Sequence, residues 1–274
     1  MDFTAARTGF LPRLVEKDYY CSVVLEYLSA ACPDVVFKGG TWLAKVHLEF
    51  FRLSEDLDFV IPVDAHAGRA ERSALSKGLK RAVDDLPAAI AGMTVSQPLK
   101  GANNSKQYAC EVTYSSTLGP RPERIKVEVG LREPLLLPSV RGSSRTLLLD
   151  PITHEPGLPI FSLACIDPDE GLSEKLRAAL TRREPAIRDL FDIDHAMRVG
   201  KLRADDPQLL ELLRAKLAIP DNSGPDVSPS RRAAFERQIA AQLQPVLREA
   251  IWRRSTSTVP SERSNRWRRA WLRI

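Results

Sequence analysis

The stretch that most constrains the fold is a short strand, a pair of glycines and a helix, followed by a strand of alternating charge. Residues 34–38 form a β-branched run that stops at Gly39 and Gly40, and residues 41–48 have a helix-forming composition. Residues 55–61 read Glu-Asp-Leu-Asp-Phe-Val-Ile and alternate charged with apolar side chains. We therefore expect this strand to pack through one face and to present carboxylates on the other.

The remainder of the chain divides into a part with strands and a part with helices. Up to about residue 150 the pattern predicts helices at 14–32 and 69–86, and strands at 93–97, 107–114, 124–129 and 145–149. Beyond it the pattern predicts helices at 168–183, 185–199, 207–217 and 231–254, the last kinked at Pro245. The sequence thus predicts an α+β fold, with a mixed α/β domain at 1–150 and a helical domain with a basic tail at 151–274.

Composition excludes several classes of protein. With 43% hydrophobic residues the chain can bury a substantial core, yet it has no apolar run of the roughly 18 residues that cross a bilayer. We expect no membrane partner and a cytoplasmic location by default. The cysteines lie far apart in apolar stretches and are expected to be buried free thiols, and the scattered histidines argue against a zinc site.

The net charge of +5 is unevenly distributed. Residues 231–274 hold eleven arginines and three glutamates, a net charge of +8, which leaves −3 for the rest of the chain. Such a segment favours nucleic acid as a partner, because each neutralised phosphate releases counterions. Trp252, Trp267 and Trp271 lie among these arginines and are suited to stacking on unpaired bases, packing on the helical domain or binding a protein. A solvated basic helix is the alternative.

Asp56 and Asp58 are the first candidates for chemistry. Residues two apart in a strand project from the same face, so two carboxylates about 7 Å apart repel each other unless a cation lies between them. Hard oxygen ligands suit Mg²⁺ or Mn²⁺, and a divalent ion carried by a nucleoside triphosphate is the expected occupant. A solvated strand edge is the alternative for an isolated Asp-x-Asp.

Glu128 is a third candidate metal ligand. It lies in the run 124–129, whose apolar residues share one face while Lys126 and Glu128 share the other. If this strand neighbours the Asp-x-Asp strand, Glu128 completes an acidic trio suited to in-line displacement at a phosphate. A solvated strand face remains the alternative.

The glycine turn is a candidate phosphate cradle. Gly39 and Gly40 let the backbone approach phosphate oxygens, and Thr41 is placed to cap the following helix. A glycine pair is often only a tight turn, so the interpretation depends on Arg52, Ser54 and the two aspartates following it.

Several segments together resemble the AbiEii/AbiGii family of nucleotidyltransferase toxins, which includes the mycobacterial MenT toxins. They are Phe-Lys-Gly-Gly-Thr-Trp-Leu-Ala-Lys at 37–45, Arg-Leu-Ser-Glu-Asp-Leu-Asp-Phe at 52–59, the stretch 173–182 and Arg-Asp-Leu-Phe-Asp at 188–192. Glu-Lys-Asp-Tyr at 16–19 is similar to the family's opening helix. No family motif is recognised after about residue 200, so the resemblance does not reach the basic tail.

This resemblance implies a fold, an activity and site residues. The fold would be that of the polymerase-β-like nucleotidyltransferases, and the activity would be Mg²⁺-dependent addition of nucleotides to RNA, notably tRNA 3′ ends, opposed by a cognate antitoxin. By matching positions, Ser54, Asp56 and Asp58 would form the metal-binding motif, Lys175 the lysine motif and Asp189 the acidic residue of the last motif. From composition alone, Lys175 would be a surface lysine and Asp189 a helix-start carboxylate.

The leading hypothesis is transfer of a nucleoside monophosphate from an NTP to an RNA hydroxyl. Asp56, Asp58 and Glu128 would hold the metal ion, and Lys175 and Arg182 would neutralise the triphosphate, with Asp189 positioning the lysine or the acceptor. The nucleotide would also contact the glycine turn, namely Gly39, Gly40, Thr41 and Ser54. The alternatives are nucleotide transfer to a protein or small molecule, and a non-catalytic nucleic-acid-binding protein.

Overall fold

The computed structural model describes residues 1–203, 205–220, 222–248 and 251–252. The chain divides into two compact units, unit 1 at Met1–Ile166 and unit 2 from Asp167 onward. Within the described ranges, no helix combines the length and the apolar composition needed to cross a bilayer.

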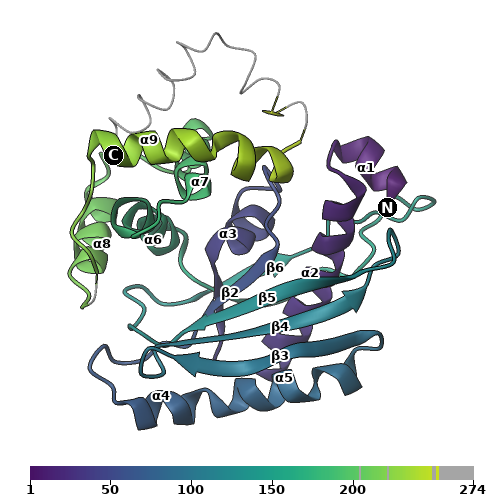
Figure 1. Ribbon diagram of the computed structural model, residues 1–274, viewed down its shortest axis with the longest axis horizontal. Helices are drawn as coiled ribbons and strands as arrows, with labels where there is room; N and C mark the ends of the chain where they lie inside the picture. Colours follow the sequence, from purple (N-terminus) through teal and green to yellow (C-terminus); the bar gives the residue numbers. More distant parts are fainter. Residues whose placement is uncertain (204, 221, 249–250, 253–274) are drawn as a thin grey trace. The chain divides into compact units, whose positions relative to one another are not determined.

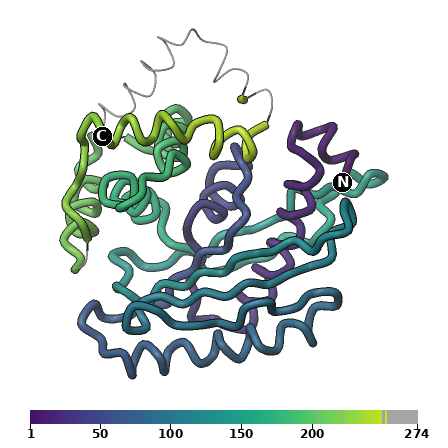
Figure 2. Tube along the Cα trace, in the orientation of Figure 1, coloured from purple at the N-terminus to yellow at the C-terminus, as the bar shows by residue number. Residues whose placement is uncertain are grey.

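Unit 1 is built on one mixed sheet of seven strands in the order β3-β4-β5-β2-β1-β7-β6 (Figure 1). The strands are β1 Val36–Lys38, β2 Asp56–Val60, β3 Met93–Ala102, β4 Gln107–Ser115, β5 Pro122–Gly130, β6 Val140–Ser144 and β7 Phe161–Cys165. The trace in Figure 2 shows β3, β4 and β5 following one another in antiparallel hairpins. β2 then pairs in parallel with β5 and antiparallel with β1, which places β2 in the middle of the sheet.

One face of this sheet packs against helices. Unit 1 contains α1 Asp2–Thr8, α2 Pro12–Ala31, α3 Gly39–Trp42, α4 Arg69–Leu75 and α5 Lys77–Ala89. α5 packs on β3 and α2 packs on β2, β5 and α5, which covers the apolar side chains of the alternating strands (Figure 1). In β2, Leu57 and Phe59 are buried while Asp56 and Asp58 are partly exposed. The expected two-faced strand is therefore confirmed, and its carboxylates lie on the face away from the apolar core.

Unit 2 contains α6 Pro168–Thr181, α7 Ile187–Arg198, α8 Pro207–Leu217 and α9 Pro229–Gln238, followed by short turns of π- and 3-10 helix at Ile239–Leu243 and Gln244–Val246. α6, α8 and α9 each begin with proline directly after a residue whose side chain caps the helix: Asp167, Asp206 and Ser228. Proline at this position loses no hydrogen bond, since the first amides of a helix have no partner within it.

The structure confirms the α+β class and corrects several element predictions. The strand predicted at 145–149 is wrong: the strand of this region is β6, and Leu149 makes only an isolated bridge to Pro156. β7 and α1 were not predicted. β7 belongs to the sheet, so unit 1 extends to Ile166, beyond the boundary near residue 150 that the sequence suggested. Helix α9 ends at Gln238, before the predicted kink at Pro245.

Candidate active site

The two strands expected to form an acidic trio are neighbours in the sheet. β2 and β5 run in parallel, with Asp56 opposite Lys126 and Asp58 opposite Glu128. The four side chains therefore lie on the same face, because their two strands are in register and each pair is two residues apart. The condition under which Glu128 joins the two aspartates on one face is therefore met.

Lys126 lies among these carboxylates. Its ammonium is 2.9 Å from Glu128 Oε1. The pKa of Lys126 is raised, chiefly by its hydrogen bond to Glu128 and further by the negative charges of Asp56 and Asp58. Within the described residues, no three His, Cys, Asp or Glu side chains converge closely enough to hold one metal ion. In this arrangement Lys126 is bonded to Glu128 and is influenced by the charges of Asp56 and Asp58.

The residues present are chemically suited to a hard divalent cation. Three carboxylates act on one ammonium at the exposed face of β2 and β5, so this face already accommodates a cation. Asp58 is also held against the glycine turn, where its Oδ2 lies 2.2 Å from the position that a Cβ on Gly39 would occupy. Carboxylate oxygens are the ligands that Mg²⁺ and Mn²⁺ prefer.

The glycine turn depends on the absence of side chains. Gly39 has a φ of +80°, which only glycine adopts readily, and a Cβ there would collide with Asp58. A Cβ on Gly40 would lie 2.7 Å from Arg52 Nη2 and 3.2 Å from Ser54 Oγ. Arg52 is buried and donates to the carbonyl of Leu53 at 3.0 Å. The glycine pair thus brings together the turn, Arg52, Ser54 and Asp58, as the sequence spacing predicted.

Thr41 has a different structural role from the one expected. Lys38 occupies the N-cap position of α3 without a side-chain capping bond, and the Thr41 hydroxyl donates instead to the backbone carbonyl of Asp56. Thr41 is buried, and this hydrogen bond ties the glycine turn to the start of β2. The chain between them includes Glu49 and Phe50, which both have positive φ values of 52° and 53°. For a residue as bulky as Phe50 this conformation is unfavourable, so the connection is held under local strain.

Helix α2 anchors the strands that carry the site. Lys17 is buried, donates to the carbonyl of Arg124, and lies 3.9 Å from Glu55 Oε2 and 3.8 Å from Glu123 Oε2. Glu55 and Glu123 stand at the starts of β2 and β5, so one lysine links the two strands just before Asp56. The adjacent Asp18 is paired with Lys45 and accepts from the amide of Leu147 at 2.6 Å. The sequence placed residues 16–19 on a helix but gave no sign that Glu16, Lys17 and Asp18 are buried.

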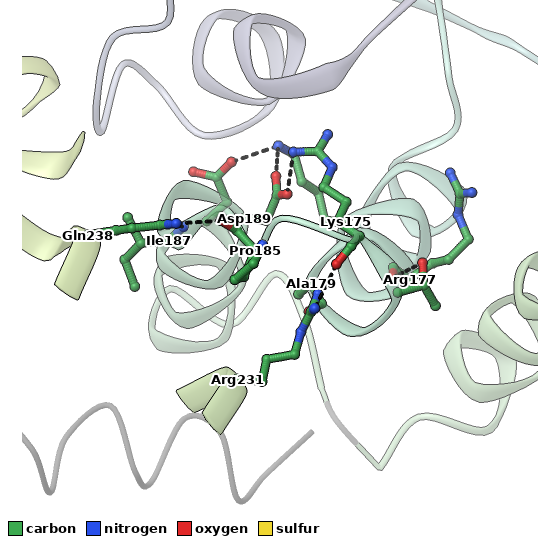
Figure 3. Close-up of polar contacts among 11 residues, drawn as sticks. Lys175, Arg177, Ala179, Pro185, Ile187, Asp189, Arg231 and Gln238 are labelled. Atoms are coloured by element: carbon green, nitrogen blue, oxygen red, sulfur yellow. Dashed lines mark hydrogen bonds and ion pairs between the residues drawn. The ribbon is translucent and has the colours of Figure 1, made fainter. Parts of the chain in front are cut away.

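Unit 2 contains the second predicted group. Lys175 of α6 lies 2.8 Å from Asp189 Oδ1 and 3.0 Å from Asp192 Oδ2, both on α7 (Figure 3). Arg182 is 2.9 Å from Asp189 Oδ2. The structure therefore brings together Lys175, Arg182 and Asp189, as the motif order implied. It adds Asp192, which is fully buried and was quoted in the motif without a role.

Two side chains of α9 hold the loop between Lys175 and Asp189, and the sequence gave no signal for them. Gln238 accepts from the amide of Ile187 at 2.9 Å and donates to the carbonyl of Pro185 at 2.7 Å, so it caps the start of α7 (Figure 3). Arg231 donates to the carbonyls of Ala179 and Arg182 at the end of α6. Helix ends leave such groups without partners inside the helix, which is why these contacts fix the loop.

The predictions for the cysteines and for the tail tryptophans lie outside the two charged groups. The four cysteines are free and buried, as expected, and burial raises the pKa of Cys21, Cys110 and Cys165 to about 12. A reactive thiol is thereby disfavoured at these positions. Of the three tail tryptophans, only Trp252 is among the described residues; the predictions for Trp267, Trp271 and the arginines around them fall outside those residues.

Comparison with known proteins identifies a family and similar folds. A family model described as "Nucleotidyl transferase AbiEii toxin, Type IV TA system" matches residues 24–272. The crystal structure of JHP933 from Helicobacter pylori is similar with a TM-score of 0.54 and 15% sequence identity, covering 96% of this chain and 92% of that chain. An H. pylori protein solved as a candidate nucleotidyltransferase has a TM-score of 0.53 and 15% identity, covering 94% of each chain. A search of the curated proteins found no match.

Proposed function

Because the chain belongs to the AbiEii family of nucleotidyl transferase toxins of type IV toxin–antitoxin systems, we propose that it transfers a nucleoside monophosphate from an NTP to an RNA hydroxyl. The acceptor that we favour is the 3′ end of a tRNA. The observation that carries this proposal is the register of β2 and β5, which sets Asp56 and Asp58 beside Lys126 and Glu128 next to a glycine turn.

The reaction follows from the carboxylates on the open face. The acceptor hydroxyl oxygen attacks the α-phosphorus, the bond from that phosphorus to the oxygen bridging to the β-phosphate breaks, and pyrophosphate leaves. The hydroxyl proton passes to a carboxylate of the trio. Asp56, Asp58 and Glu128 would hold Mg²⁺ or Mn²⁺, which when bound supplies positive charge to the phosphate oxygens.

The remaining residues bind and orient the nucleotide. Ser54 and the backbone of Gly39 and Gly40 are proposed to contact phosphate oxygens, and Thr41 to keep the turn in place through its bond to Asp56. Lys175 and Arg182 are proposed to neutralise the triphosphate. Asp189 contacts both of these cations and therefore acts as a positioning residue. An ammonium held by two carboxylates has a fixed direction, which lowers the ordering cost when phosphate binds.

Two observations support RNA as the acceptor and an antitoxin as a protein partner. The Arg-rich segment 231–274 has a net charge of +8, which suits a polyanionic acceptor. Membership of a type IV toxin–antitoxin family implies an antitoxin partner. We propose that this antitoxin is a protein encoded beside the toxin and that both act in the cytoplasm.

The test is incubation of the purified protein with Mg²⁺, total tRNA and each α-³²P-labelled NTP in turn. We expect label in RNA with the intact protein and none with Asp58→Ala, and the NTP that labels RNA is the substrate. Label that enters a protein added in place of RNA would redirect the proposal to a protein acceptor. Absence of label with every NTP and both acceptors would overturn the enzymatic proposal.

A further inference from the structure

Lys126 lies on the same strand face as the acidic trio. It stands opposite Asp56 in the parallel pairing of β2 and β5, two residues before the pair formed by Asp58 and Glu128. In a parallel pair with evenly spaced hydrogen bonds, side chains in register on one face are close neighbours. A long side chain at this position therefore stands beside Asp56 and, two residues along its own strand, beside Glu128.

The contacts show how this lysine is used. Its ammonium binds Glu128 Oε1 at 2.9 Å. Glu111, which stands opposite Lys126 on the other side in β4, lies 3.5 Å from Arg124 instead. On the far side of β2, Lys38 stands opposite Asp58. Lys126 is thus directed toward the trio and binds the one carboxylate of the trio that lies on its own strand.

The exposure of Lys126 makes its contact replaceable. Its side chain is 48% exposed, so the ammonium can turn into water without leaving a buried charge behind. Such a half-exposed ion pair contributes little net free energy, because solvent and salt screen it. A divalent ion carries twice the charge of the ammonium, so the same oxygens attract it more strongly.

From this arrangement we infer that Lys126 is a built-in competitor of the catalytic metal ion. It pairs with Glu128 when no metal is bound, and it must release Glu128 before that carboxylate can bind a metal. Lys126 thereby weakens metal binding and makes occupancy depend on the ion that arrives with the nucleotide. This inference rests on the metal site of the proposed function, because competition requires that Asp56, Asp58 and Glu128 bind the ion.

The direct test measures Mn²⁺ binding to the full-length protein without nucleotide, by electron paramagnetic resonance of the free ion. Replacing Lys126 with glutamine removes the competing charge, so Lys126→Gln should bind Mn²⁺ about tenfold more tightly than the wild type. Lys126→Arg keeps a cation at the same position and should bind no more tightly than the wild type.

Two further variants separate this effect from others. Lys100→Gln removes the same charge from an exposed position on β3 and should leave the Mn²⁺ affinity unchanged. Asp58→Asn should abolish the binding that Lys126→Gln strengthens. If Asp58→Asn binds like the wild type, both the metal site and the competition are wrong. If Asp58→Asn loses binding but Lys126→Gln is no tighter than the wild type, the metal site stands and the role of Lys126 is overturned.

Discussion

The two charged groups of the protein differ in how deeply their lysines are buried. In unit 1, Asp56, Asp58 and Glu128 share one strand face with Lys126, which pairs with Glu128 and whose side chain is 48% exposed. In unit 2, Lys175 is only 12% exposed between two carboxylates, of which Asp192 is fully buried. Lys126 is thus half exposed on a strand face, whereas Lys175 is largely closed to water, although Arg182, the other cation bound to Asp189, is 54% exposed.

This difference separates an ion pair that solvent can open from one that is already assembled. Carboxylates gathered on one exposed face repel each other, and such groups are more frequent at functional sites than elsewhere. A buried, paired lysine cannot lose a partner cheaply, because the remaining charge stays out of water. The predictions below test this contrast, in decreasing order of the expected effect.

The largest effect is expected at Asp58. Asp58→Asn should lower nucleotide transfer by about 1000-fold, since it removes a charge that acts on the reacting phosphate. The free energy of unfolding should change by no more than about 1 kcal/mol, because Asp58 is only partly buried. Initial rates and urea denaturation check the two halves. Asp84→Asn on the exposed side of α5 is the control and should change neither quantity.

The next effect is on the stability of the protein and distinguishes Lys175 from Lys126. Lys175→Met should lower the free energy of unfolding by about 3 kcal/mol, because it leaves Asp192 buried without its partner lysine. Lys126→Met should change it by no more than about 0.5 kcal/mol, because the pair with Glu128 is half exposed. Urea denaturation of both variants measures the difference. Equal losses would show that the two groups do not differ in the way described.

A third effect concerns the glycine turn beside Asp58. Gly39 and Gly92 both have a φ of +80°, so alanine at either position costs about 1 kcal/mol of backbone strain. Only at Gly39 would the new Cβ also meet Asp58, whereas at Gly92 nothing lies within 4 Å. We expect Gly39→Ala to lower transfer by about 100-fold, and Gly92→Ala to leave the rate unchanged. A similar rate for both variants would remove the turn from the site.

The smallest effect is a pH dependence in unit 2. Burial lowers the pKa of His195 from 6.5 to about 4, with a further contribution from Arg198 and opposed by Asp192. The unfolded chain then binds this proton more readily than the folded chain, so stability is complete above pH 6.5 and declines as the pH falls toward 4. Thermal unfolding between these pH values should show a smaller decline for His195→Asn. His66→Asn, at an exposed position of unit 1, should decline like the wild type.

Local patterns were sufficient to predict most of the framework of the site. The alternation in residues 55–61 and 124–129 placed Asp56, Asp58 and Glu128 on polar faces, and both strands are confirmed. The pairing of these two strands depends on which strands meet in space. From the sequence it could be stated only as a condition for Glu128 to join the two aspartates. The family motifs supplied Lys175 and Asp189, which composition would have assigned to an ordinary helix surface.

The missed features depend on contacts between distant parts of the chain. Gln238 and Arg231 look like ordinary polar residues of a surface helix, yet they cap α7 and α6 from far along the sequence. Lys17 likewise reads as an exposed lysine but lies buried between the starts of two strands. The strand expected at 145–149 failed because its apolar residues pack beside α1 and α2 without pairing in the sheet; Leu147, for example, lies in a cluster with Phe10 and Leu14.

The measurement that tests the central claim most directly compares the two ends of the triphosphate. The protein is incubated with tRNA and the NTP identified above, labelled with ³²P either at the α- or at the γ-phosphate, beside Asp58→Asn. A nucleotidyltransferase places the α-label in RNA, releases the γ-label as pyrophosphate, and does neither once Asp58 is replaced. Entry of the γ-label into RNA, or α-label transfer that survives in Asp58→Asn, would contradict the account.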